Sequence, residues 1–72
     1  MLIKHDFERE LQRSWWRSAA DLAEELQDEG WEVIGINSEN IEVQRDGERY
    51  AIILCGTERT VVIQEAKYLG SW

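Results

Sequence analysis

The chain of 72 residues carries eight basic and fifteen acidic side chains, one cysteine and no proline, and its formal net charge is −7 at pH 7. This length predicts a single domain spanning residues 1–72. So short a chain buries only about 60% of its unfolded surface, and a partner or a second copy is expected to supplement the core. The negative charge opposes nucleic-acid backbones and anionic membranes and suits a basic protein surface, although it also serves solubility alone.

An N-terminal helix is the first expected element, beginning at Asp6 as its N-cap and ending at Gly30 as its C-terminal cap. Apolar residues recur every three or four positions along one face: Phe7, Leu11, Trp15, Ala19, Leu22 and Leu26. The run Ser18-Ala19-Ala20-Asp21 resembles a capping box, so a helix that breaks and restarts near Ser18 is the alternative. The unbroken stripe and the absence of an interrupting glycine or proline favour one continuous helix.

The charges of this helix are unevenly distributed. Arg9, Arg13 and Arg17 recur every four residues beside Trp16, whereas the second half of the helix is acidic. Tryptophan and arginine are enriched in binding hot spots, so Trp16 is a candidate partner-binding residue. The alternative, which we favour, places Trp16 beside the core and pairs the arginines with nearby acidic residues: Asp6, Glu8, Glu10 and Asp21.

The strongest turn signal is Asp46-Gly47, because both residues tolerate positive φ and the flanking residues alternate between apolar and polar. A two-residue loop at this point pairs two sets of apolar residues across the strands: Val43 with Tyr50, and Ile41 with Ile52. Those four side chains share one face of the sheet, which is the predicted core face.

Strands are also expected on both sides of this hairpin. A turn at Ser38-Glu39 gives three upstream pairs: Ile36 with Ile41, Ile34 with Val43, and Glu32 with Arg45. A turn at Thr57-Glu58 gives two downstream pairs, Val61 with Leu54 and Ile63 with Ile52, while a three-residue loop would use Val62 instead. The predicted fold is therefore α+β, with one long helix packed on one face of a four-stranded antiparallel meander.

The face of the sheet opposite the helix is expected to carry apolar residues, because one helix covers only one side of such a sheet. These residues are Trp31, Val33, Ala51, Ile53, Cys55 and Val62. Exposed apolar patches on small proteins mark interfaces, so Trp31, Val33, Ala51, Ile53 and Val62 are predicted to bind another protein or a second copy in a homodimer. In the alternative, residues 1–3 and the tail 68–72 fold across this face.

The sequence offers little for catalysis or metal binding. His5 and Cys55 have no partner at zinc-type spacing, and no histidine is positioned to activate Cys55, which is expected to be a small buried hydrophobe. The prediction is a protein without enzymatic activity, catalytic residues, metal or cofactor; an enzyme using Cys55 or clustered carboxylates is the alternative. No apolar run reaches the length of about 18 residues that a membrane span needs, and the N-terminus has no signal-peptide region, so a cytoplasmic protein is expected.

Two stretches, LAEELQDEGWEVIG and NIEVQRDGERYAII, resemble the core of restriction-endonuclease-like nucleases of the Mrr type over about half the chain. The resemblance implies a hairpin with an Asp on its second strand and a Glu or Gln and a Lys on its third. The corresponding positions hold Asn40, Ile53 and Cys55, so the resemblance implies an inactive relative. A shifted correspondence would use Asp46, Glu65 and Lys67. The family also requires a helix after Thr60, where we predict a strand.

Three functions are compatible with these observations. The first, which we favour, is a small acidic protein-binding module, such as a phage-type inhibitor that occupies a basic surface of a nucleic-acid enzyme. The second is an inactive nuclease-like domain in an assembly. The third is an enzyme using Cys55 or clustered carboxylates. A separate alternative is an engineered scaffold without a natural function: the absence of proline, the Asp-Gly hairpin and the terminal Gly-Ser-Trp favour it, whereas the adjacent tryptophans and the free cysteine argue against it.

Overall fold

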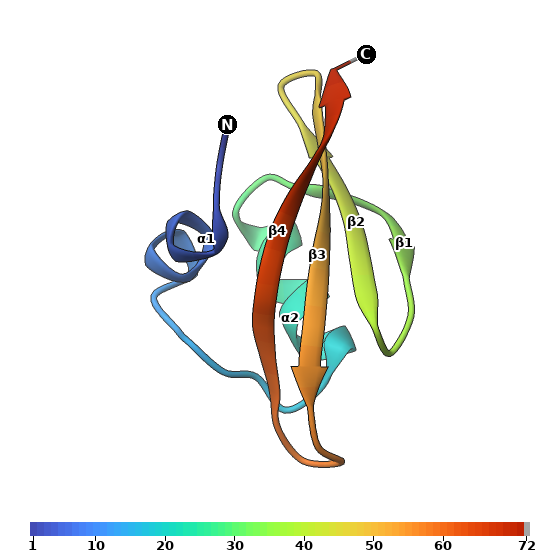
Figure 1. Ribbon diagram of the computed structural model, residues 1–72. Coiled ribbons are helices and arrows are strands. Elements are labelled where there is room, and N and C mark those ends of the chain that lie inside the picture. The colour runs from blue at the N-terminus through green and yellow to red at the C-terminus, as the bar shows by residue number, and fades with distance from the viewer. Residues whose placement is uncertain (72) are drawn as a thin grey trace.

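The computed structural model describes residues 1–71. Two helices precede four strands (Figure 1): α1 (Lys4–Leu11), α2 (Ala19–Asp28), β1 (Glu32–Ile36), β2 (Asn40–Arg45), β3 (Glu48–Gly56) and β4 (Val61–Ser71). The strands form one antiparallel sheet in the order β1-β2-β3-β4, which confirms the α+β class and the meander. Within the described residues, no helix has the length and apolar character required to cross a membrane.

The prediction of one long helix was wrong. α1 ends at Leu11 because Gln12 adopts a left-handed conformation with φ 58°. The chain then runs without helix to Ser18, whose hydroxyl oxygen accepts a hydrogen bond from the backbone N–H of Asp21 at 3.1 Å and caps α2. The restart near Ser18, which the capping signal offered as the alternative, is therefore what the structure contains.

The break is explained by the two adjacent tryptophans. Trp16 is completely buried, and its backbone exchanges two hydrogen bonds with Val61 at the start of β4, of 2.8 and 2.7 Å. A continuous helix would keep the backbone groups of Trp16 inside the helix and direct Trp15 inward. In the structure the side chain of Trp15 is 49% exposed. Burial of the Trp16 side chain, together with its two backbone hydrogen bonds to Val61, thus outweighs continuation of the helix.

The predicted caps of the helical region had mixed outcomes. Asp6 is not an N-cap but the third residue of α1, and its carboxylate accepts from the backbone N–H of Ile3 at 2.8 Å. Gly30 does end α2, with φ of +90°. The N–H groups of Gly30 and Trp31 donate to the carbonyls of Gln27 and Leu26, both at 3.0 Å, which is a Schellman motif.

The central hairpin confirms its prediction. Val43 lies opposite Tyr50, and Ile41 lies opposite Ile52. The turn residues Asp46 and Gly47 both have positive φ, 54° and 80°, as a two-residue hairpin turn with the correct twist requires.

Strand β1 differs from its predicted register by a bulge. Ile36 lies opposite Ile41 as predicted, but the register shifts between Val33 and Gly35. Val33 therefore lies opposite Val43 in place of Ile34, and Glu32 lies opposite Gln44 in place of Arg45. Because one extra residue reverses the alternation of side chains, Val33 packs against the core and Ile34 is 37% exposed.

The β3–β4 hairpin follows neither predicted register. Gly56 lies opposite Val61, so residues 57–60 form a four-residue connection, closed by a 2.8 Å hydrogen bond from the N–H of Thr57 to the carbonyl of Thr60. A Cβ atom at Gly56 would overlap that carbonyl oxygen, so the turn requires glycine there. A bulge between Ile53 and Leu54 and another between Arg49 and Tyr50 shift the later part of β4.

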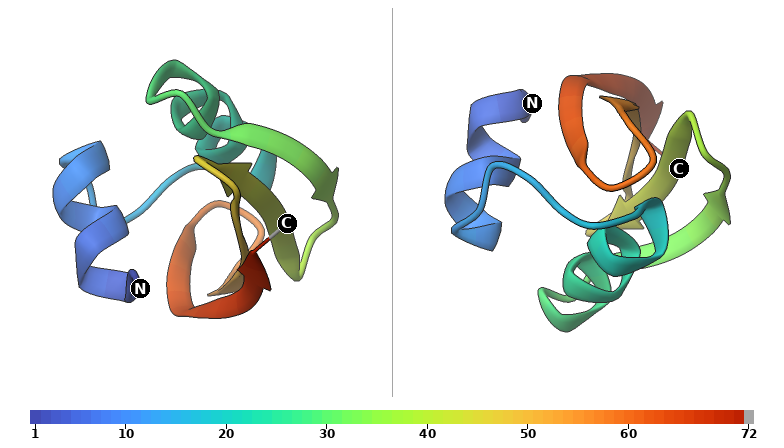
Figure 2. Two further views of the ribbon diagram at one scale, coloured as in Figure 1. Left: turned by 90° about the horizontal axis from the view of Figure 1, so that it is seen from above. Right: turned by 90° about the horizontal axis from the view of Figure 1, so that it is seen from below.

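The core lies between the sheet and both helices, which share one side of it (Figure 2). At its centre four aromatic rings lie within 5.8 Å of a neighbour, centroid to centroid: Phe7, Trp31, Tyr50 and Tyr68. The hydroxyl of Tyr50 accepts from the backbone N–H of Leu2 at 2.8 Å, which attaches the start of the chain to the sheet.

Candidate interaction surfaces

The far face, which is the side of the sheet turned away from α1 and α2, holds fewer apolar residues than predicted. Trp31 is only 4% exposed and belongs to the core, because the Schellman turn at Gly30 directs it inward. The bulge in β1 brings Val33 to the core face as well. Their predicted placement on the far face was therefore wrong.

The remaining members of the predicted patch stay on the far face but have polar neighbours. Ala51 is 7% exposed and lies between Glu42 and Lys67 on the adjacent strands. Ile53 is half-buried between Asn40 and Glu65 in the same way.

At the end of β3, Cys55 is exposed and lies opposite the half-buried Val62. Cys55 therefore lies on the far face, as predicted. The expectation that it is buried was wrong. The partner-binding role of Ala51, Ile53 and Val62 stays a prediction, now for a surface on which apolar and charged side chains alternate.

The described parts of the two termini do not cross the far face, although the alternative prediction requires this. Leu2 packs against the core, while Met1 is 85% exposed. Residues 68–71 belong to β4, and Tyr68 also packs on the core. The last residue of the predicted tail, at position 72, lies outside the described residues.

Two of the three arginines of the predicted stripe, Arg9 and Arg13, pair with carboxylates, whereas Arg17 forms no ion pair within residues 1–71. Arg9 lies 3.8 Å from Asp6, and Arg13 forms ion pairs with Asp21, at 3.8 Å, and with Glu25. The guanidinium of Arg13 also lies over the rings of Trp15 and Trp16, at 5.3 and 5.9 Å. Because Trp16 is buried, these arginines and Trp16 do not form a common exposed surface.

A polar network joins α1 to the sheet at Arg45. The guanidinium donates to both carboxylate oxygens of Glu10, at 2.7 and 3.0 Å, and to the carbonyl of Glu29 at 2.9 Å. It also lies 4.0 Å above the ring of Trp31, whose Nε1–H donates to Glu10 at 2.7 Å. The predicted strand register pairs Arg45 with Glu32 instead, because nothing in the sequence indicates that α1 packs beside β2.

This network shifts the pKa values of both Glu10 and Arg45. The hydrogen bond from Arg45 lowers the pKa of Glu10 below its ordinary value, and the bond from Trp31 acts in the same direction. The same contact with Glu10 raises the pKa of Arg45. Both groups are therefore held in their charged forms, and the contact serves to attach α1 to the sheet.

The exposed side of α2 carries carboxylates that form no ion pair with residues 1–71. Glu24 and Asp28 are both exposed and lie four residues apart, hence on one face of the helix. We call these two residues the α2 acidic surface. Their neighbours Asp21 and Glu25 on the same face are engaged by Arg13, so the carboxylates of this face are only partly neutralised.

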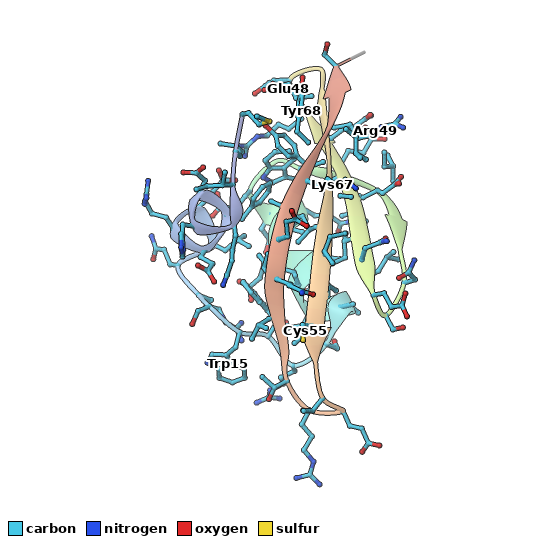
Figure 3. The ribbon with its side chains drawn as sticks, viewed as in Figure 1. Trp15, Glu48, Arg49, Cys55, Lys67 and Tyr68 are labelled. Carbon is cyan, nitrogen blue, oxygen red and sulfur yellow. The ribbon has the colours of Figure 1, made fainter. Side chains whose placement is uncertain are left out.

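The residues considered for catalysis are not brought together. Cys55 lies near the end of β3 (Figure 3). It borders a groove formed by the β1–β2 and β3–β4 turns, which Ser38, Glu39 and Glu58 also line. His5 belongs to α1, where its Nδ1 lies 3.0 Å from Glu8. In the region 1–71, no three side chains of the types that bind metals gather into a possible site.

The positions that the nuclease resemblance singles out are spread along the sheet. Asn40 lies opposite Ile53, with Cys55 two residues further along β3. In the shifted correspondence, Asp46 lies in the β2–β3 turn, whereas Glu65 and Lys67 lie in β4. The segment after Thr60 is this strand, where the resemblance requires a helix.

Comparison with other proteins adds no relative to these observations. Neither a protein-family model, nor a curated protein, nor a solved structure matches the chain. The surfaces described above are therefore the observations that bear on function.

Proposed function

We propose that the protein is a non-enzymatic binding module whose α2 acidic surface docks on a basic surface of another protein. A basic groove that normally holds nucleic acid is the partner surface with the best complementarity, and occupation of that groove would inhibit its owner. The observation that carries this proposal is the pair of exposed carboxylates, Glu24 and Asp28, which form no ion pair with any residue in the described range 1–71.

The distribution of ion pairs supports the proposal. Arg9, Arg13 and Arg45 each pair with other carboxylates of their own chain, and none of them forms an ion pair with Glu24 or Asp28. The net charge of −7 attracts a positively charged partner and so increases the association rate, while it disfavours binding of nucleic acid itself.

Helix α2 is also a rigid support for these carboxylates. Ser18 caps its first turn and Gly30 closes its last, while Leu22 and Leu26 on the opposite side are completely buried. A surface that is already ordered loses little conformational entropy on binding, which favours affinity.

The experiment compares two charge-reversal variants with the same net charge. Glu24→Lys/Asp28→Lys alters the α2 acidic surface, whereas Glu39→Lys/Glu58→Lys alters exposed turn residues. Each protein is immobilised and exposed to a lysate fraction enriched in nucleic-acid-binding proteins, and retained proteins are displaced with duplex DNA. We expect the natural chain and the turn variant to retain the same proteins, and the α2 variant to retain them about tenfold more weakly because like charges oppose each other.

Equal retention by the two variants would contradict the role of α2. Retention that duplex DNA does not displace would contradict competition for a nucleic-acid groove. The absence of any retained protein would contradict the proposed function altogether.

A further inference from the structure

Strand β4 forms one edge of the sheet, and within residues 1–71 only its first residue has a backbone hydrogen-bond partner on the outer side. That partner is Trp16, whose backbone exchanges two hydrogen bonds with Val61. Beyond this bridge, no backbone hydrogen bond of residues 1–71 reaches the outer side of β4. The rest of this edge therefore offers backbone donors and acceptors to another strand.

The direction of these backbone groups follows from the hairpin registers. Arg45 and Glu48 flank the two-residue turn as a hydrogen-bonded pair, so every second residue of β3 from Glu48 onward directs its N–H and C=O toward β2. The N–H of Leu54, which donates to the carbonyl of Glu39 at 2.8 Å, agrees with this alternation.

The same alternation fixes the outward groups of β4. Ile52 directs its backbone groups toward β2, so Ala66, which lies opposite Ile52, directs its own groups outward. Its neighbours Glu65 and Lys67 direct their backbone groups toward β3. Ala66 is therefore a central hydrogen-bonding residue of the free edge.

Two charged side chains flank Ala66. Glu65 lies opposite Ile53 and Lys67 lies opposite Ala51, so both project from the far face, on which Figure 3 labels Lys67. Both are exposed, and neither forms an ion pair with a described residue. The edge therefore presents one anion and one cation, placed symmetrically about Ala66.

We propose that a second copy of this chain pairs antiparallel with β4 about a two-fold axis at Ala66. In this register the two Ala66 residues exchange backbone hydrogen bonds, and Glu65 of each copy lies opposite Lys67 of the other. These two positions form non-hydrogen-bonded pairs, in which side chains approach most closely, so two ion pairs form across the axis. The two sheets become one sheet of eight strands.

The charges select this register among the symmetric ones. An axis at Glu65 or at Lys67 would place identical charges opposite each other, which destabilises a strand pair. Ala66 itself is small and half-buried, so it leaves room for its counterpart. A lysine on a sheet edge ordinarily prevents association, but here Glu65 of the second copy neutralises it.

The bulges limit the extent of this pairing. One lies at Gln64 and the other at Leu69, so the regular part of the edge comprises residues 65–68. An interface of this size gives a dimer that dissociates on dilution. The proposal concerns β4 and not the α2 acidic surface, so it stands or falls separately from the proposed function.

The test uses single charge reversals on the edge. Glu65→Lys leaves two lysines on the edge and Lys67→Glu leaves two glutamates, so each variant opposes its own copy. A mixture of the two variants restores both ion pairs. The control variants Glu58→Lys and Arg59→Glu change the net charge equally at exposed turn residues.

Sedimentation equilibrium is measured over a range of protein concentrations. We expect the natural chain and both controls to dimerise, each single edge variant to dimerise at least about tenfold more weakly, and the equimolar mixture to regain the natural association. A natural chain that stays monomeric throughout would overturn the proposal. Edge variants that associate as well as the controls would overturn it too, because the dimer would then use another surface.

Discussion

The two helices share one side of the sheet, but different kinds of interaction stabilise them. α2 has a side-chain cap at Ser18, a Schellman motif at Gly30 and two completely buried leucines. α1 has eight residues and begins after Ile3, whose side chain cannot accept a hydrogen bond. Its long-range attachments are the ring of Phe7, the carboxylate of Glu10 and the segment around Leu2.

The difference shows that helices of similar length can depend on different parts of the sequence. A helix of eight residues is unstable in isolation, so α1 forms because its side chains find partners on β2 and β3. α2 is also short, but signals for its start and end lie within its own flanking residues. Substitutions in the partners should therefore affect α1, and substitutions in the caps should affect α2.

The largest effect is expected from removal of the aromatic anchor of α1. Phe7→Ala deletes a side chain that is 1% exposed and that contacts the rings of Trp31 and Tyr50, at 5.1 and 5.6 Å between centroids. The free energy of unfolding should fall by about 3–5 kcal/mol, measured by urea denaturation. This is comparable to the total stability of so small a domain.

A milder variant keeps this prediction measurable if Phe7→Ala does not fold. Phe7→Leu should lose about 1–2 kcal/mol, since it retains part of the buried volume. The control Trp15→Ala, at a side chain that is 49% exposed, should change stability by about 0.5 kcal/mol or less. A loss for Phe7→Leu no larger than for the control would refute the role of Phe7 as an anchor.

An intermediate effect is expected from the polar attachment of α1. Glu10→Gln removes the negative charge that Arg45 contacts through two hydrogen bonds, and should lower the free energy of unfolding by about 1.5 kcal/mol. Glu24→Gln, on the exposed side of α2, is the matched control and should have almost no effect.

The pH dependence identifies the charge as the cause. The folded pKa of Glu10 lies below its ordinary value of 4.5, so its contribution is present above that pH and is lost as the pH falls through the folded pKa. The difference in stability between the natural chain and Glu10→Gln should therefore shrink on acidification below about pH 4.5. A difference that stays constant down to pH 2 would exclude the ion pair as its source.

The smallest effect is expected at the start of α2. Ser18→Ala removes the hydroxyl that accepts from the N–H of Asp21 and should cost about 1 kcal/mol. Ser18→Asp should retain nearly all of the stability because a carboxylate also caps. Ser14→Ala, at an exposed residue of the connection, serves as the control, and a loss there equal to that of Ser18→Ala would argue against capping.

Elements that depend on a few neighbouring residues were predictable from the sequence. The Asp46-Gly47 turn fixed the β2–β3 register, and the signals at Ser18 and Gly30 marked two helix ends. The apolar stripe predicts a continuous helix, but the cap at Ser18 marks the start of a separate one. The burial of Trp16 against Val61, which interrupts that stripe, depends on a contact between residues 45 positions apart.

The far face was only partly predictable for a related reason. Strict alternation placed Val33 and Trp31 on it, and a single bulge and a tight turn moved both to the core. Gly35 is a local signal for the bulge, because an isolated glycine inside a strand often marks one, but it does not determine where the register shifts. The pairing of Arg45 with Glu10 likewise required knowledge of where α1 packs.

Gly56 has a consequence for the free edge of the sheet, because it lies opposite the first residue of the edge strand β4. With no room for a methyl carbon beside the Thr60 carbonyl, this position dictates how tightly the last hairpin closes and where β4 begins its pairing. A shift of one residue in the register of β4 would turn the side chains of Glu65 and Lys67 to the core face and that of Ala66 to the far face. The glycine of this turn, together with the bulge at Gln64, therefore sets which side chains β4 presents along the free edge of the sheet.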